Sequence, residues 1–87
     1  DYKLAVVDLF KARKFKEARQ LLCSQARPEE MEEVFSWMFN NLDLWSDTDE
    51  GQDEAILIIK KGARDHSMCA DPEINLSATL IELQQIG

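Results

Sequence analysis

Apolar residues recur at helical spacing from the start of the chain. A first group lies between Leu4 and Phe10, and a second group lies between Phe15 and Leu22, after the basic segment KARK at 11–14. Steps of three and four residues place such positions on one side of an α-helix. The pattern predicts two short helices, with apolar positions Leu4, Val6, Val7, Leu9 and Phe10, then Phe15, Ala18, Leu21 and Leu22.

A longer apolar stripe follows Pro28. Proline suits the first position of a helix, where its missing N–H costs nothing, and the glutamates after it suit the positive end of the helix dipole. We therefore expect a third helix from Pro28 to about Trp45 and the thickest part of the core along it. Its stripe consists of Met31, Val34, Phe35, Met38, Leu42 and Trp45, broadened by Trp37 and Phe39.

The segment SDTDEGQDE at 46–54 interrupts this pattern with polar and turn-forming residues. Asp49 followed by Gln52 resembles a capping box, so we expect a loop and then a fourth helix from about Glu50 to Met68. The first half of that helix is apolar around much of its circumference, which predicts the most buried helix of the domain. The four residues 56–59 (ILII) leave a strand open as an alternative, although no partner strand is evident.

The last helix has two apolar sides. Asp71 supplies a side-chain cap and Pro72 the first turn. At about 100° per residue, one side gathers Ile74, Ala78 and Ile81, and the opposite side gathers Leu76, Leu80 and Leu83. Such a helix is either enclosed within its own bundle or keeps one side for a neighbouring chain, and the pattern leaves both alternatives open.

Composition supports a single all-α domain, a compact bundle of about five helices over residues 1–87. The chain has 45% hydrophobic and 31% charged residues but only 3 glycines and 2 prolines. Cys23 and Cys69 form one possible pair, and neither a leader segment nor a long apolar run occurs, so we expect a cytoplasmic protein with reduced thiols. Because the chain starts at Asp1 inside a predicted helix, we interpret it as the C-terminal fragment of a longer protein.

Charge divides the chain unevenly. Residues 1–27 hold seven Lys or Arg against three acids, whereas residues 28–87 hold three against fourteen, so a net +4 precedes a net −11. The acidic part would repel nucleic acid and anionic lipid. We therefore expect no membrane partner and confine any DNA contact to one candidate basic patch, which a solvated helix surface also explains: Lys11, Arg13, Lys14, Lys16 and Arg19.

No pattern of catalytic or cofactor-binding residues is evident. His66 and Cys69 fall short of the four ligands that tetrahedral zinc requires. We instead expect His66 at a helix end or in the core with a hydrogen-bond partner. We expect the two cysteines to pack as small hydrophobic residues. The carboxylates gather at helix starts and in a polar loop, and there is no glycine-rich phosphate loop. We predict no catalytic residue, no metal and no cofactor in this fragment. Helical spacing favours core packing over base stacking for Trp37, Phe39 and Trp45.

Four stretches together resemble the C-terminal collar domain of the small subunits of DNA sliding-clamp loaders. They are FKARKFKEARQLL, EEMEEVFSWMFNNL, DEAILIIKKGARDHSMCADPEINL and LSATLIEL. The family includes replication factor C small subunits and the small clamp-loader subunits of T4-like phages. The resemblance covers nearly the whole chain in helix order and length, with the most specific match at Phe15–Leu22 and Asp71–Leu83. The acidic loop at 46–52 and the scarcity of basic residues after Arg27 depart from the family pattern, and they favour a phage-like loader acting in a bacterial or infected-host cytoplasm.

The resemblance implies a function in assembly. In this family the collar domains close into a ring that holds the loader together during DNA replication, while separate N-terminal AAA+ modules bind ATP, the clamp and primer-template DNA. The parent protein would then be an AAA+ ATPase, and this fragment would contact other loader subunits. The candidate subunit interface is the leucine side of the last helix: Leu76, Leu80 and Leu83. The alternative function is that of a general helical protein-interaction domain from another assembly.

Overall fold

The computed structural model describes residues 2–68 and 70–86. Those residues form five α-helices, joined by short turns and two single-turn 3₁₀ helices, and contain no β-strand, so the predicted all-α bundle is confirmed. Residues 56–59 are helical, which excludes the strand alternative. The helices are α1 (Tyr2–Lys11), α2 (Phe15–Gln25), η1 (Pro28–Glu30), α3 (Met31–Phe39), η2 (Leu42–Leu44), α4 (Asp49–His66) and α5 (Pro72–Gln84).

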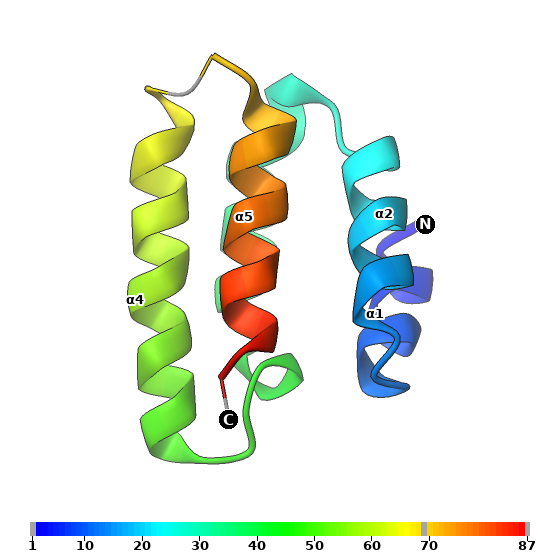
Figure 1. Cartoon of the computed structure of the whole chain (residues 1–87), viewed down its shortest axis with the longest axis vertical. Coiled ribbons are helices and arrows are strands. Elements are labelled where there is room, and N and C mark those ends of the chain that lie inside the picture. Colours follow the sequence, from blue (N-terminus) through cyan, green and yellow to red (C-terminus); the bar gives the residue numbers. More distant parts are fainter. Residues whose placement is uncertain (1, 69, 87) are drawn as a thin grey trace.

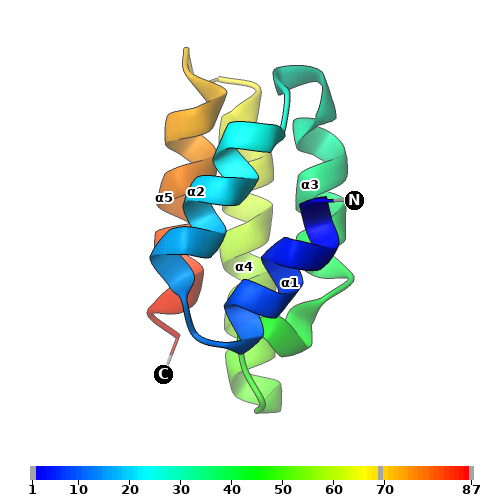
Figure 2. The same ribbon diagram turned by 90° about the vertical axis from the view of Figure 1, so that its right-hand side faces the viewer.

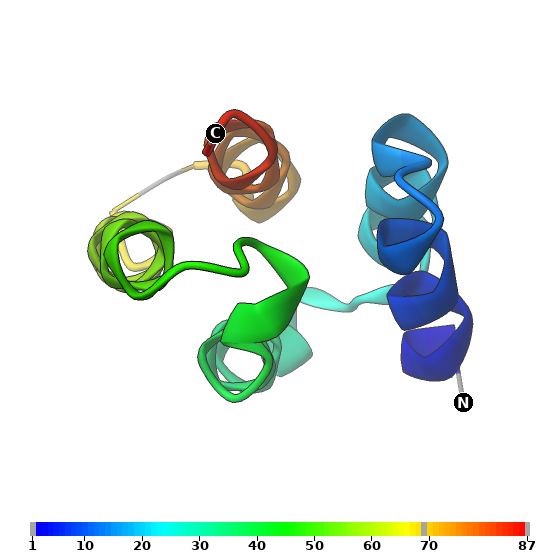
Figure 3. The same cartoon turned by 90° about the horizontal axis from the view of Figure 1, so that it is seen from below.

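The helices form two groups. Helices α3, α4 and α5 pack together, with α4 and α5 side by side along the long axis and α3 behind α5 (Figure 1). Helices α1 and α2 form a pair that covers the remaining side of this group, as the view from below shows (Figure 3), and α2 packs against α5 (Figure 2). The turn between α1 and α2 is tight because Arg13 adopts a left-handed conformation (φ 61°), which lets the Lys14 amide donate to the Leu9 carbonyl at 2.9 Å.

The core lies where the two groups meet. Phe10 of α1 packs edge-on against Trp45, with ring centroids 4.9 Å apart, and the Trp45 Nε1–H donates to the Met38 carbonyl at 3.1 Å. An indole in an apolar setting needs such a partner for its N–H. Each α-helix contributes to the buried hydrophobic set, which comprises Val6, Phe10, Ala18, Leu22, Ala26, Met31, Val34, Phe35, Met38, Trp45, Ala55, Ile59, Leu76, Leu80 and Leu83.

Helix α3 is shorter than predicted. The stripe reaches Trp45, but the α-helix ends at Phe39 and the chain turns through η2. The Asn41 side chain donates to the Trp37 carbonyl at 2.8 Å and so occupies an acceptor near the end of the helix. Leu42 and Trp45 therefore reach the core from a 3₁₀ turn, while Phe39, predicted as core, is 50% exposed.

Two predictions for α4 were wrong. Its cap is Thr48, whose hydroxyl accepts from the Gly51 amide at 3.0 Å, rather than an Asp49–Gln52 capping box; Gln52 instead donates to the Ser46 carbonyl. It is also not the most buried helix, because α3 and α5 cover it on one side only, at the edge of the bundle (Figure 3). Leu57, in the middle of the apolar run, is 67% exposed.

Candidate interaction surfaces

Local sequence determines where α5 begins. The Asp71 carboxylate accepts from the Glu73 amide at 3.0 Å, and Pro72 occupies the first turn, as predicted. Asp71 satisfies one of the amides that a helix start leaves unpaired, and Glu73 adds negative charge near the positive end of the dipole. The start of the helix is thus independent of the packing that then orients it.

One buried polar contact joins α5 to α4, and a second lies within α5. The Asn75 amide donates to the Gly62 carbonyl at 2.8 Å, and the Thr79 hydroxyl donates to the Asn75 carbonyl at 2.9 Å. Both side chains are buried, where an unpaired polar group would be costly. Because Asn75 bonds directly to the neighbouring helix, rotation of α5 about its axis would break this contact.

Gly62 permits the close approach of the two helices. A Cβ atom at this position would overlap the Thr79 hydroxyl and lie 2.8 Å from Cε1 of Phe35. Glycine destabilises a helix interior by about 1 kcal/mol relative to alanine, so its presence in mid-helix has a packing reason here. The contact joins α3, α4 and α5 at one point.

The leucine side of α5 faces the interior of its own bundle. Leu76, Leu80 and Leu83 are 0%, 1% and 0% exposed in the single chain. Their assignment as a subunit interface is therefore corrected: a second chain could not reach them without opening the core. The structure instead shows the other alternative, in which the leucine side of α5 is buried inside the bundle.

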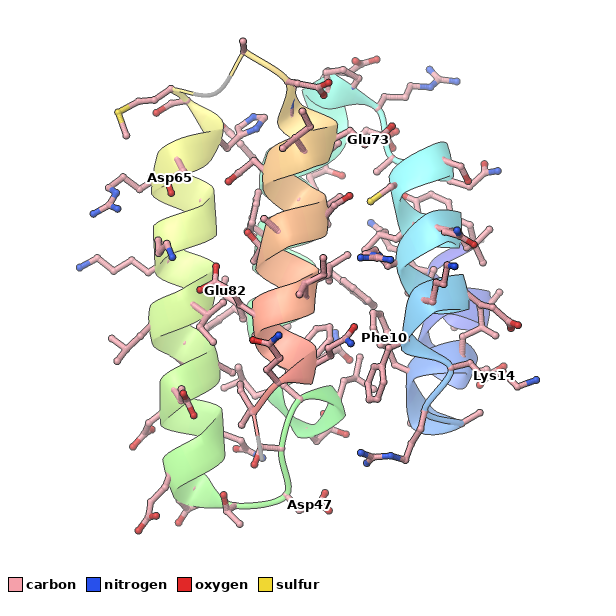
Figure 4. All side chains as sticks on the ribbon, in the orientation of Figure 1. Phe10, Lys14, Asp47, Asp65, Glu73 and Glu82 are labelled. Carbon is pink, nitrogen blue, oxygen red and sulfur yellow. The ribbon has the colours of Figure 1, made fainter. Side chains whose placement is uncertain are left out.

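The isoleucine side of α5 faces outward instead. Ile74 is 67% exposed, Ala78 is exposed and Ile81 is half-buried. Beside this side, Lys61 of α4 and Glu82 of α5 form an ion pair with Nζ–Oε2 at 3.1 Å, and Figure 4 shows Glu82 between the two helices. The two apolar sides of the helix thus have different environments, one enclosed and one open.

Three of the five residues of the predicted basic patch line hollows in the surface. Lys11 and Arg13 line a hollow of about 260 Å³, together with Asp43 and Asp47. The Arg13 guanidinium lies 5.4 Å from the centroid of the Phe15 ring.

The remaining three residues of the patch do not line this hollow. Arg19 lines another hollow, beside Glu73, and Lys14 points outward from the α1–α2 pair (Figure 4). Lys16 is exposed on α2. Acids therefore share the hollows that three of these five cations line: Asp43 and Asp47 with Lys11 and Arg13, and Glu73 with Arg19.

A groove between α3 and α4 was not predicted. Its volume is about 530 Å³, and Phe35, Ile59 and Ala63 line it together with the half-exposed Phe39. The remaining lining residues are polar or charged: Glu32, Ser36, Asn40, Lys60 and His66. The sequence signal for this groove was the excess breadth of the α3 stripe, which we interpreted as core.

Three polar side chains that were singled out in the sequence or lie partly buried have unusual surroundings. His66 is the last residue of α4, as expected, but its Nδ1 is buried and has no hydrogen-bond partner within residues 2–68 and 70–86. Burial raises the pKa of the Cys23 thiol, although a contact with the Ser77 hydroxyl at 3.2 Å lowers it in part. Burial, reinforced by Glu30 and Glu33, raises the pKa of Tyr2. The Cys69 predictions lie outside the described residues.

Among residues 2–68 and 70–86, no group of three or more His, Cys, Asp or Glu side chains is placed to hold a metal ion. None of the helices over the same residues has the length and apolar character needed to cross a bilayer. Comparisons with protein-family models, curated proteins and solved structures gave no match.

Proposed function

We propose that this chain is the collar, or oligomerisation, domain of a small subunit of a DNA sliding-clamp loader. In this function it holds neighbouring subunits together during DNA replication, while N-terminal AAA+ modules of the same protein bind ATP, the clamp and primer-template DNA. The order and lengths of the helices, on which the resemblance depends, support the proposal. So does α5, which completes the core with one side and leaves the other open.

The open side of α5 is the interface that we propose. The proposed contact residues are no longer the leucines but the side chains that a neighbouring subunit can reach: Ile74, Ala78 and Ile81. Complete burial of an isoleucine stabilises by roughly 1.5 to 3 kcal/mol. Association costs about 4 to 15 kcal/mol in lost freedom of motion. One such surface is therefore too weak to hold a ring, and the AAA+ modules must contribute further contacts.

Substitution of Ile74 tests this interface. In the full-length subunit, Ile74→Asp should leave the domain folded and weaken the ring, since it places a charge in an apolar contact. Sedimentation of the assembled loader measures the loss, and Leu57→Asp on the outer side of α4 is the matched control. A ring unaffected by Ile74→Asp, or a tight pentamer of the isolated chain at micromolar concentration, would argue against the proposed arrangement.

The upstream coding sequence tests the parent protein. A phosphate-binding loop and the other AAA+ motifs should lie N-terminal to Asp1 in the same reading frame. An upstream region without them would instead favour a helical interaction domain from another assembly. The observation that favours this second candidate is the groove between α3 and α4.

A further inference from the structure

We propose that the hollow between the α1–α2 turn, the segment around η2 and the end of α5 binds a small zwitterion, a molecule with one carboxylate and one ammonium group. The ligand carboxylate lies toward Lys11 and Arg13 of the turn, and the ammonium group lies toward Asp43 and Asp47. The hollow shares no lining residue with the open side of α5, and the proposal stands whether or not the chain is a collar domain.

Three separate parts of the chain build this hollow. Phe10 comes from α1, Trp45 follows η2 and Leu83 belongs to α5, and all three side chains are buried. The Phe10 and Trp45 rings contact edge-on with centroids 4.9 Å apart, which joins two of the three parts. Figure 4 shows Phe10 pointing from the α1–α2 pair toward the rest of the bundle, and Asp47 on the segment that leads into α4. The hollow therefore depends on the packing of the core and not on one exposed helix surface.

Local contacts hold the two charged sides of the hollow in place. In the α1–α2 turn, the Arg13 guanidinium lies 5.4 Å from the centroid of the Phe15 ring, within the range of a cation–π interaction. On the other side, the Gln52 side chain donates to the Ser46 carbonyl at 3.0 Å, directly before Asp47. A site whose groups are held before the ligand arrives loses less freedom of motion on binding.

The charges of the lining determine the chemistry of the occupant. Among the described residues, the lining contains two cations, Lys11 and Arg13, and two carboxylates, Asp43 and Asp47. None of the four forms an ion pair within residues 2–68 and 70–86, so each can receive a charged group of a ligand. An ion of one sign would be attracted by one pair and repelled by the other, whereas a zwitterion can be attracted by both.

The size of the hollow limits the occupant further. Its volume of about 260 Å³ is below the range of about 300 to 1,000 Å³ that is typical of pockets for drug-sized ligands. The aromatic floor is almost covered, with Phe10 3% and Trp45 6% exposed, so a ligand gains little by burying apolar surface. We therefore expect a molecule of amino-acid size. Because exposed ion pairs contribute little each, its dissociation constant should be about millimolar.

Titration of the 87-residue chain with three amino acids, followed by NMR of the backbone amides, tests the proposal. Glycine, γ-aminobutyrate and ε-aminocaproate differ in the separation of their two charges. For the best binder of the three, we expect the largest amide shifts at residues 10–15, 43–47 and 83–86. It should bind about fivefold tighter than the same molecule without its amine or without its carboxyl group, because each analogue loses one attraction and keeps one repulsion.

Two paired substitutions distinguish charge recognition from a change in the fold. Lys11→Gln with Arg13→Gln should weaken binding of the zwitterion about fivefold and strengthen binding of the amine analogue, because only carboxylates remain in the lining. Asp43→Asn with Asp47→Asn should weaken the zwitterion to a similar extent and strengthen binding of the acid analogue. Both effects should be smaller at high salt, which screens exposed charges. A perturbed fold would instead weaken binding of all three ligands.

The matched controls carry the same charge changes outside the hollow. Lys14→Gln with Lys16→Gln removes two exposed cations, and Asp53→Asn with Glu54→Gln removes two exposed acids of α4. Both controls should bind the zwitterion as the unmodified chain does. Circular dichroism of every variant verifies that the helices are retained.

Three outcomes would overturn the proposal. They are the absence of amide shifts at the hollow with all three amino acids, affinity for a singly charged analogue that equals the affinity for the zwitterion, and equal losses in the hollow variants and the controls. Because Ile74 lies outside the hollow, Ile74→Asp should leave zwitterion binding intact, which separates this test from that of the collar.

Discussion

The two apolar sides of α5 differ in solvent exposure: one is buried and the other is exposed. The leucine side is enclosed, with Leu80 1% exposed, whereas Ile74 on the other side is 67% exposed. Hydrophobicity does not explain the difference, since both sides consist of aliphatic residues. One polar contact distinguishes them: Asn75, next to Leu76, donates to the Gly62 carbonyl of α4, whereas the Thr79 hydroxyl donates to the Asn75 carbonyl within α5. A single buried polar contact between two helices can thus help to fix which apolar side of a helix is enclosed.

Among substitutions that test this comparison, one at Leu80 should lower the stability of the domain most. Leu80→Asp removes a fully buried side chain and places a charge in the core, which we expect to cost about 4 kcal/mol or more. This is a large part of the total stability of so small a domain, so the chain should unfold. Circular dichroism with urea titration measures the change.

The matched substitution on the open side is Ala78→Asp. Ala78 is exposed, and we expect a cost below about 1 kcal/mol, from lower helix propensity alone. If Leu80→Asp retained the helices while Ala78→Asp lost them, the orientation of α5 described here would be reversed.

Substitution of Gly62 should have the next largest effect on stability. Gly62→Ala inserts a methyl group against Thr79 and Phe35, and we expect a net destabilisation of about 1 to 2 kcal/mol, because the overlap outweighs the gain in helix propensity. Urea titration again provides the measurement.

A double-mutant cycle with Thr79→Ala identifies the cause. Removal of the Thr79 side chain should make Gly62→Ala less harmful than it is alone, because the two atoms that overlap are no longer both present. A stabilisation of about 1 kcal/mol by Gly62→Ala alone would show that helix propensity dominates and that α4 and α5 are not in close contact at this point.

The helices themselves could be predicted because they depend on local signals. Pro28 and Pro72 lie in the first turns of their helices, and the cap at Asp71 forms as predicted. Where two local signals competed, the prediction failed. Thr48 and Asp49 are both suitable caps one residue apart, and the Ser46–Thr48 contact at 3.1 Å stabilises the first of them.

The surfaces could not be predicted because they depend on contacts between helices. An apolar run shows that a helix can be buried on all sides, but it does not show how many helices pack against it. Helix α4 has such a run, yet it lies at the edge of the bundle and its Leu57 is exposed. Phe39 appeared to belong to the core stripe, yet α3 ends there and its side chain lies at the edge of a groove. Likewise the charge pattern of residues 11–19 did not show that Lys11 and Arg13 would share a hollow with Asp43 and Asp47.

The smallest effect is expected at the ion pair beside the open side of α5. Lys61 and Glu82 join α4 to α5 across the surface, with side chains 53% and 40% exposed. Exposed pairs contribute about 0 to 1 kcal/mol, so Glu82→Gln should reduce stability by less than about 1 kcal/mol, and less still at high salt. A cycle with Lys61→Gln measures the coupling by urea titration at two salt concentrations. If the coupling exceeded about 2 kcal/mol and did not respond to salt, the pair would lie in a shielded environment, and this edge of α5 would be covered rather than open to a neighbouring chain.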